Sequence, residues 1–165
     1  MLTLTSPSFG PGQLIPRNHT ADGLNRSPPL TWSNPPAGTR SLALVVEDPD
    51  APDPAAPQRT FCHWIVYNLS PGAGQLALNA SKEPLAPGVR AGRNDFGETG
   101  YGGPAPPIGR HRYFFRLFAL DAVLPDALGA CDRATLMRAL AGHVLEESQL
   151  MGLYERERAE PQPRI

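Results

Sequence analysis

Residues 41–52 read S-L-A-L-V-V-E-D-P-D-A-P. The first eight are almost continuously apolar, and a short apolar run of this kind, bounded by turn residues, is typical of a strand buried on both faces. The D-P-D-A-P motif that follows contains two prolines, which interrupt the backbone hydrogen bonding of a sheet. The pattern therefore predicts a buried strand over 41–48 that ends abruptly at Asp48.

Two further strands are predicted, over 61–69 (F-C-H-W-I-V-Y-N-L) and over 110–120 (R-H-R-Y-F-F-R-L-F-A-L). Side chains alternate between the two faces of a strand. In the earlier strand, this alternation predicts one face made of Phe61, His63, Ile65 and Tyr67, and an opposite face made of Cys62, Trp64, Val66 and Asn68. In the later strand, it predicts one face made of His111, Tyr113, Phe115 and Leu117. A shorter segment over 27–32 is also expected to be extended, because its prolines disfavour helix.

One helix is predicted over 132–147, with Asp132 as its N-cap. Leu136, Leu140 and Val144 recur there at helical spacing. We expect a last short strand over 150–156 and a frayed, charged tail over 158–165. The 165 residues are the size of one domain, which we place over 1–157.

Composition excludes several classes of protein. The formal net charge is −1, which argues against binding to nucleic acid or anionic membranes through bulk charge. Apolar runs fall well short of the roughly 20 residues of a membrane-spanning helix, and the start of the chain lacks a signal-peptide pattern, so a cytoplasmic location is expected. Two cysteines, Cys62 and Cys131, are too few for a disulfide framework.

Proline and glycine are the unusual part of the composition, at 20 and 16 residues. So many prolines exclude a helix bundle, since each costs about 3 kcal/mol inside a helix. They favour short strands joined by turns and fixed loops. The segment 88–109 is the longest such loop, with seven glycines and three prolines in 22 residues. Loops this long in a compact domain are usually functional or disordered, and the aromatic and charged residues here favour a functional loop.

Four residues could carry chemistry: Asp48 and Asp50 at the end of a strand, His63 on the next strand and His111 at the start of the later one. If the three strands are neighbours, Asp48, His63 and His111 converge beneath the 88–109 loop. Each also has a structural explanation. The aspartates can bond backbone N–H groups within a turn, and a histidine beside a tryptophan is more often a core residue than a ligand.

Two arginines, Arg112 and Arg116, alternate with aromatic residues along the later strand. Either they are solvated, or one is buried with a carboxylate partner such as Glu47. His143 is expected on the helix surface, and His19 in a loop without a neighbouring partner.

Several kinds of active site are not supported. The chain has no G-x-S-x-G elbow, no H-E-x-x-H motif, no paired C-x-x-C and no phosphate-binding glycine motif. Two histidines and two aspartates could hold a metal, but their spacing is not that of a metal site. No cofactor is therefore expected. An anion pocket remains, in which imidazoles and glycine N–H groups donate hydrogen bonds to a phosphate or carboxylate.

Five motifs occur in an order and spacing that resemble one known family. They are S-P-P-L-T-W at 27–32, D-P-D-A-P at 48–52, H-W at 63–64, G-Y-G-G-P at 100–104 and G-R-H-R-Y-F-F at 109–115. The chain resembles the phosphatidylethanolamine-binding proteins, also called Raf-kinase-inhibitor-like proteins, and looks like their compact bacterial or archaeal branch. The resemblance extends from about Phe9 to Glu155.

The resemblance implies a mainly β fold, an antiparallel Greek-key β-sandwich with a few peripheral helices. It also implies a pocket for phosphate-like anions or phospholipid headgroups. The positions of this chain that match the family's pocket are Asp48, Asp50, Pro52, His63, Gly103, Pro104, His111 and Tyr113. Phe61 falls where some members carry an aromatic lining residue. Cis peptide bonds are implied at Ala51–Pro52 and at Arg59–Thr60.

Two departures from the animal members concern the rim of this pocket. Residues 105–108 read A-P-P-I, which is not the pattern of those members. The chain also stops soon after Tyr154, without the C-terminal helix that partly covers their pocket. We therefore expect a more open pocket, or one covered by a partner subunit, and the resemblance implies a homodimer.

Three functions are compatible with these residues. The first is a non-enzymatic binding protein that takes a small anion or headgroup and acts through a partner, such as a kinase or protease that it inhibits. The second is a hydrolase of a small ester or phosphoester with Asp48 and His63 as an acid–base pair, which lacks an evident nucleophile. The third is a structural or assembly protein with a vestigial pocket.

Overall fold

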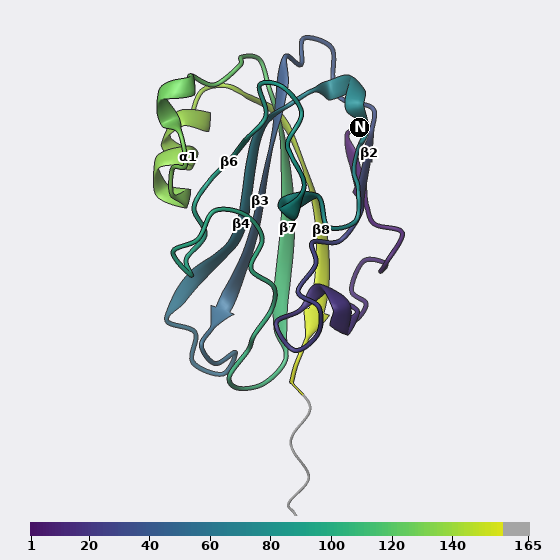
Figure 1. Cartoon of the computed structure of the whole chain (residues 1–165), viewed down its shortest axis with the longest axis vertical. Coiled ribbons are helices and arrows are strands. Elements are labelled where there is room, and N and C mark those ends of the chain that lie inside the picture. Colours follow the sequence, from purple (N-terminus) through teal and green to yellow (C-terminus); the bar gives the residue numbers. More distant parts are fainter. Residues whose placement is uncertain (157–165) are drawn as a thin grey trace, which may run out of the picture.

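The computed structural model describes residues 1–156 as two antiparallel sheets with one α-helix (Figure 1). The larger sheet runs in the order β6 (Arg90–Ala91), β4 (Arg59–Leu69), β3 (Ser41–Ala51), β7 (His111–Leu120) and β8 (Val144–Tyr154). The smaller sheet has β1 (Thr3–Thr5), β2 (Leu30–Ser33) and β5 (Gln75–Leu76) in that order. Helix α1 covers Arg133–Leu140, and 3-10 helices lie at Arg17–His19, Pro71–Ala73, Ala80–Lys82 and Asp126–Leu128. The mainly β, two-sheet fold expected from the sequence is confirmed.

Strand β3 lies at the centre of the larger sheet, between β4 and β7. Its residues from Ser41 to Asp48 are all buried, which explains their nearly continuous apolar sequence. The prediction that the strand ends at Asp48 was wrong, because β3 continues to Ala51. The register with β4 shifts between Asp48 and Ala51, and a proline is tolerated at such an irregularity, where no ladder N–H is needed.

Strand β4 departs from simple alternation at His63. Val46 pairs with Trp64 and Glu47 pairs with Cys62, so His63 is one extra residue in the ladder. Beyond this β-bulge the side-chain faces are exchanged. Trp64 and Val66 belong to one core cluster, and Cys62, Ile65 and Tyr67 belong to the other. The predicted faces of this strand were therefore wrong on one side of the bulge.

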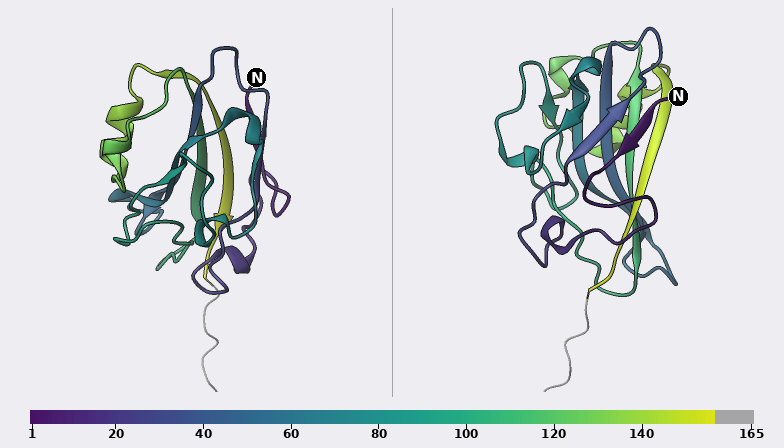
Figure 2. Two further views of the ribbon diagram at one scale, coloured as in Figure 1. Left: turned by 45° about the horizontal axis from the view of Figure 1, so that its top comes forward. Right: turned by 90° about the vertical axis from the view of Figure 1, so that its right-hand side faces the viewer.

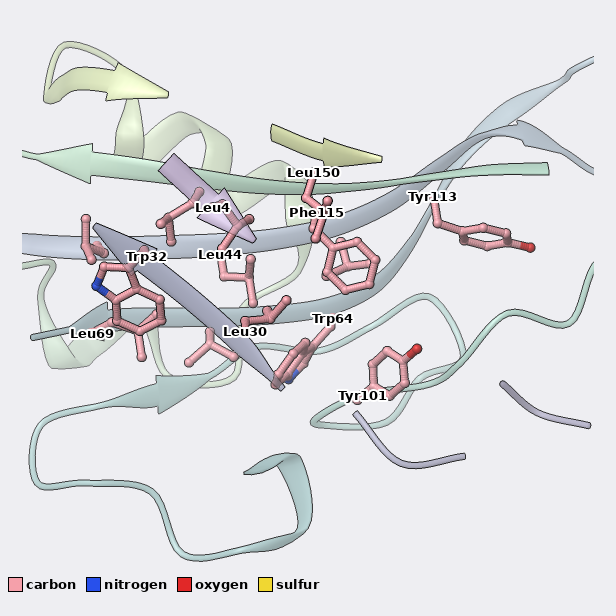
Figure 3. Close-up of a cluster of buried hydrophobic side chains, with 14 of the residues drawn as sticks. Leu4, Leu30, Trp32, Leu44, Trp64, Leu69, Tyr101, Tyr113, Phe115 and Leu150 are labelled. Carbon is pink, nitrogen blue, oxygen red and sulfur yellow. The ribbon is translucent and has the colours of Figure 1, made fainter. Parts of the chain in front are cut away.

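Two hydrophobic cores lie on the two faces of the larger sheet. Strands β1 and β2 run obliquely across one face (Figure 2), where they enclose the cluster that includes Trp32, Leu44, Trp64 and Phe115 (Figure 3). Helix α1 covers part of the other face, and its Leu136 and Leu140 pack with Val45. The shared face predicted for β7 is confirmed for Tyr113, Phe115 and Leu117, which all join the cluster beneath β1 and β2.

The helix predicted over 132–147 is much shorter in the structure. The Asp132 side chain accepts a hydrogen bond from the Thr135 N–H, as expected of an N-cap, but the helix ends at Leu140. Gly142 has a φ of 82°, a left-handed conformation that cannot continue a helix. Val144 then begins β8, which pairs with β7 over its whole length and replaces the short strand expected over 150–156. Local helical spacing was outweighed by long-range strand pairing.

No helix within residues 1–156 is long and apolar enough to span a membrane. The frayed tail predicted over 158–165 lies outside the described residues.

Candidate ligand-binding site

A cavity of about 160 Å³ opens at the end of the larger sheet where β3 finishes and β4 and β7 begin. Strand β3 contributes Asp48 to it, β4 contributes His63, and β7 contributes His111 and Tyr113. These strands are direct neighbours in the sheet. The expected convergence of Asp48, His63 and His111 is therefore found.

Part of the 88–109 loop forms one wall of the cavity. Phe96 packs its ring on Phe61 with a centroid distance of 4.7 Å and on His63 at 5.6 Å. Ala105, Pro106 and Pro107 form another part of the lining. Composition singled out this loop, but no pattern identified Phe96 as the residue that covers the histidine.

Buried Asn94 holds this wall in place. Its Oδ1 accepts hydrogen bonds from the N–H groups of Phe96 and Glu98, and its Nδ2 donates to the Gly100 carbonyl at 2.9 Å. The next residue, Asp95, accepts a hydrogen bond from the Cys62 N–H at 2.7 Å. The loop is thus tied both to itself and to β4.

His111 is bonded at both ring nitrogens. Nδ1 lies 2.6 Å from Asp48 Oδ2, and Nε2 lies 2.8 Å from the Ile108 carbonyl oxygen. Both side chains of the Asp48–His111 pair are almost completely buried. Asp48 Oδ1 also accepts the Asp50 N–H at 2.7 Å. The sequence-based idea that two imidazoles donate to one anion is therefore wrong in this geometry, since His111 has no nitrogen to spare.

His63 has one ring nitrogen left open. Its Nδ1 lies 2.7 Å from the Gly102 carbonyl oxygen, which can only accept, so Nδ1 carries the proton. Nε2 makes no hydrogen bond with any residue from 1 to 156, and His63 is part of the cavity lining. Burial lowers the pKa of His63, and the neighbouring carboxylates of Asp48 and Asp95 only partly oppose this effect.

Two hydrogen-bond donors complete the cavity. The Tyr113 hydroxyl forms no hydrogen bond with any other residue from 1 to 156, and burial raises the pKa of this phenol, which keeps its proton. Arg59 lies at the exposed rim, with its guanidinium carbon 4.9 Å from the Phe61 ring centroid. Within residues 1–156 the guanidinium forms no ion pair. Neither its sequence position nor its neighbours indicated that Arg59 would reach the cavity.

Three of the expected ligand-binding residues are not in the cavity lining. The Asp50 carboxylate is bonded instead to Arg112, whose Nε and Nη2 donate to the two carboxylate oxygens at 3.0 and 2.9 Å. Gly103 and Pro104 instead attach the loop to the segment 19–25. The Gly103 N–H donates to Asn25 Oδ1, and a Cβ on Gly103 would lie 2.5 Å from that oxygen.

Pro52 lines the cavity, and its bond to Ala51 is cis, as expected. The Arg59–Thr60 bond is not cis, which corrects the second of these expectations. Arg59 already pairs with Ala51 in the ladder of β3 and β4, where extended trans backbone fits and a cis bond would cost about 3 kcal/mol.

Glu47, beside Asp48 in β3, lies on the other face of the sheet. Its carboxylate is buried and is bonded by Arg116 Nη1 at 2.7 Å and by Arg133 Nε at 2.5 Å. The buried pairing of one strand arginine with Glu47 is therefore confirmed. His143 is exposed beside Asp121, but in the turn after α1, and His19 is buried with Nδ1 3.0 Å from the Arg26 carbonyl.

Comparison with known proteins is consistent with this architecture. The family model for phosphatidylethanolamine-binding protein matches residues 5–155. A UPF0098 protein of Methanothermobacter thermautotrophicus is 43% identical over 156 residues, which cover 94% of this chain and 99% of the relative.

Two crystal structures are also similar. A phosphatidylethanolamine-binding protein homolog from Chlamydia trachomatis has a TM-score of 0.85 at 40% identity, covering 94% of this chain and 98% of the other. YbcL of E. coli, described as a member of the mammalian family, has a TM-score of 0.85 at 32% identity, with coverages of 94% and 99%. A family match across nearly the whole sequence, together with the shared fold, shows that this chain belongs to the phosphatidylethanolamine-binding protein family.

Proposed function

We propose that the chain is a non-enzymatic binding protein whose cavity takes a small oxyanion, such as a phosphate group free or in a headgroup. The observation that carries the proposal is that two donors at the cavity, the Tyr113 hydroxyl and the Arg59 guanidinium, form no hydrogen bond or ion pair with any residue from 1 to 156. Asp48 is the acid in the cavity lining, and its carboxylate already accepts hydrogen bonds from the Asp50 N–H and from His111.

The size of the cavity limits the ligand. At about 160 Å³ it is smaller than the roughly 300–1,000 Å³ of pockets that enclose drug-sized molecules. A phosphate group or a short headgroup suits this volume, and the acyl chains of a lipid would have to remain outside. Phe96 in the cavity lining is about half exposed and would lie beside the part of the ligand that follows the anion.

Calorimetric titration tests this function. The probes are inorganic phosphate, phosphoethanolamine and a short-chain phosphatidylethanolamine, each added to the wild-type protein, Tyr113→Phe and Arg59→Gln. Loss of one donor to a charged ligand should weaken binding about tenfold. Tyr67→Phe and Arg138→Gln are matched controls on the other face of the sheet and should bind normally. Failure of every probe to bind the wild type would favour the structural role instead.

The hydrolase alternative has a specific difficulty in this geometry. Asp48 pairs with His111, not with His63, and His111 Nε2 is bonded to the Ile108 carbonyl. Neither ring is therefore arranged as an Asp-supported base facing the cavity. We expect no turnover of p-nitrophenyl phosphate or p-nitrophenyl acetate. Turnover that is lost in Asp48→Asn would contradict the proposal.

We further propose that the protein acts through a protein partner such as a kinase or protease, and that it works in the cytoplasm. A fold relative, a carboxypeptidase Y inhibitor, was crystallised with its cognate proteinase, but at 19% identity and a TM-score of 0.54 it shares the fold alone. Inhibition assays against kinases and proteases, including carboxypeptidases, with and without phosphate, test the partner.

A further inference from the structure

We infer that Phe96 makes the cavity prefer an organic phosphate ester over inorganic phosphate, and that Asn94 acts through Phe96 as a positioning residue. Both residues belong to the 88–109 loop. The preference rests on the proposed anion-binding function and extends it to the organic group attached to the anion.

The Phe96 ring is partly packed and partly open. It meets the Phe61 ring edge to face at a centroid distance of 4.7 Å and lies 5.6 Å from the His63 ring. Phe96 is nevertheless 47% exposed, and it is part of the cavity lining. A ligand group placed against this lining would remove apolar ring surface from water, which is favourable.

Asn94 determines the backbone turn that carries the ring. Its side chain is buried, and its Oδ1 accepts the N–H groups of Phe96 and Glu98 at 3.0 and 3.1 Å. Its Nδ2 donates to the Gly100 carbonyl at 2.9 Å. An asparagine that bonds the backbone two residues further on stabilises a turn. The cavity lining found within residues 1–156 does not include Asn94, so its influence on a ligand passes through the residue that it positions.

Two neighbours of this turn limit where the ring can lie. The Cys62 N–H donates to the Asp95 carboxylate at 2.7 Å, and the Asp95 N–H donates to the Cys62 carbonyl at 2.9 Å, which joins the turn to β4. Gly102 passes so close to the ring that a Cβ there would lie 2.4 Å from Phe96 Cδ2. The ring is therefore held in place before a ligand arrives, and a ligand does not lose affinity by ordering it.

Inorganic phosphate and an organic ester would use this cavity differently. Tyr113 and Arg59 can donate hydrogen bonds to the phosphate oxygens of either ligand. The cavity of about 160 Å³ has room for the phosphate, and an attached organic group would lie against the apolar part of the lining. Phe96, Pro106 and Pro107 belong to that part, and their side chains offer no hydrogen bond to an anion. Only the ester gains from contact with them.

Calorimetric titration with inorganic phosphate and phenyl phosphate tests the preference. At about pH 8 both ligands are mainly dianions, so the comparison isolates the organic group. The wild-type protein should bind phenyl phosphate about fivefold or more tightly than inorganic phosphate. Phosphoethanolamine extends the comparison to a headgroup and should also bind more tightly than inorganic phosphate.

Phe96→Ala tests the role of the ring. The substitution should remove most of the preference for phenyl phosphate and leave the affinity for inorganic phosphate nearly unchanged. Leu78→Ala is the control, because Leu78 is an apolar residue of similar exposure, 49%, outside the cavity lining, and this variant should keep the preference. A preference that survives Phe96→Ala would overturn the assignment.

Asn94→Ala tests the positioning role. It should lower the preference about as much as Phe96→Ala, and the double variant should lower it no further, because both changes act on one ring. Additive losses would show that Asn94 does not act through Phe96.

Asn68→Ala is the matched control for Asn94→Ala. The Asn68 amide also bonds a backbone carbonyl and a backbone N–H, both of Leu124, but Asn68 lies outside the cavity lining. This variant should lose stability and keep the preference. Thermal melting establishes that each variant is folded. Asn94→Ser, whose hydroxyl can accept the Phe96 N–H, replaces Asn94→Ala if that variant does not fold.

Proton NMR of the ligand-free protein measures the position of the ring without a ligand. Phe96 lies close enough to His63 for its ring current to shift the resonances of the His63 ring protons. Those resonances should move in Asn94→Ala in the same direction as in Phe96→Ala, and unchanged resonances would overturn the positioning role. Equal affinity of the wild type for phenyl phosphate and inorganic phosphate would overturn the ester preference and leave the anion pocket intact. Absence of binding by every anion would overturn the proposed function as well.

Discussion

His111 illustrates how single residues hold the cavity together. Its ring bridges Asp48 in β3 and the Ile108 carbonyl in the loop, and its side chain is 1% exposed. Removing the ring would leave the Asp48 carboxylate buried without its partner. Removing one partner of a buried ion pair destabilises a protein far more than the intact pair stabilises it.

We therefore expect His111→Ala to lower the free energy of unfolding by about 3–5 kcal/mol, measured by urea denaturation. The comparison variant is His143→Ala, which breaks the exposed pair with Asp121 and should cost less than about 1 kcal/mol. A loss of similar size in both variants would show that the Asp48 carboxylate finds water or another donor when His111 is absent.

His63 and His19 should make stability depend on pH. Burial lowers the pKa of each below the ordinary value of 6.5. Below that pH the unfolded chain takes up more protons than the folded one, so stability is present at higher pH and is lost as the pH falls. His63 alone contributes up to about 1.4 kcal/mol for each pH unit.

Urea denaturation between about pH 7.5 and pH 5.5 measures this slope. The free energy of unfolding should fall as the pH is lowered, and His63→Gln should flatten the slope. The Asp50 carboxylate contributes in the same direction only at much lower pH, because Arg112 lowers its pKa from 3.8. Unchanged stability across this range would show that both rings can take up a proton in the folded state.

At the scale of elements, Asp50 connects β3 to β7. The Arg112 guanidinium and its backbone N–H both donate to this carboxylate, the latter at 2.9 Å. The Arg112 side chain is half exposed, so solvent screens part of the attraction. Asp50 therefore connects β3 and β7 beside the cavity, whereas the sequence predicted a ligand-binding role for it.

Asp50→Asn should therefore lower the free energy of unfolding by about 1–2 kcal/mol and leave phosphate affinity within about twofold of wild type. Denaturation and calorimetry on one preparation measure both quantities. A loss of phosphate affinity without a loss of stability would restore Asp50 to the binding site.

The junction between α1 and β8 depends on the backbone conformation of Gly142. Gly142 has a φ of 82°, and no atom lies within 4 Å of the position that a Cβ would take there. A side chain at this position would therefore be strained by the backbone conformation and not by a steric clash. Gly142→Ala should cost about 1 kcal/mol. Gly72→Ala is the matched control, since Gly72 also has open space around it but no left-handed φ, and it should be neutral or slightly stabilising. Equal changes in the free energy of unfolding for the two variants would contradict a left-handed conformation at Gly142.

For the whole molecule, the family resemblance predicts a homodimer. Light scattering after size exclusion should report twice the 17.8 kDa mass of the chain at micromolar concentration. A mass of one chain across the concentration range would contradict the prediction. Repeating the measurement with saturating phosphate shows whether assembly and the cavity are coupled.

Local patterns in the sequence determined a large part of this protein. The apolar run at 41–48 predicted the central strand because burial on both faces leaves only apolar choices. Alternation predicted which side chains of β7 share a face, and the ordered motifs predicted that Asp48, His63 and His111 belong to one pocket. These features depend on residues that are close in sequence, or on motifs that keep their order along the chain.

Tertiary structure decided the partners within the site. Asp48 pairs with a residue 63 positions away and Asp50 with one 62 positions away, and two aspartates in one motif thereby acquire different roles. The bulge at His63 exchanged the faces of β4, and pairing with β7 converted a helical pattern into β8. These pairings depend on the energies of contacts between segments that are distant in sequence, and the propensities of neighbouring residues do not include those energies.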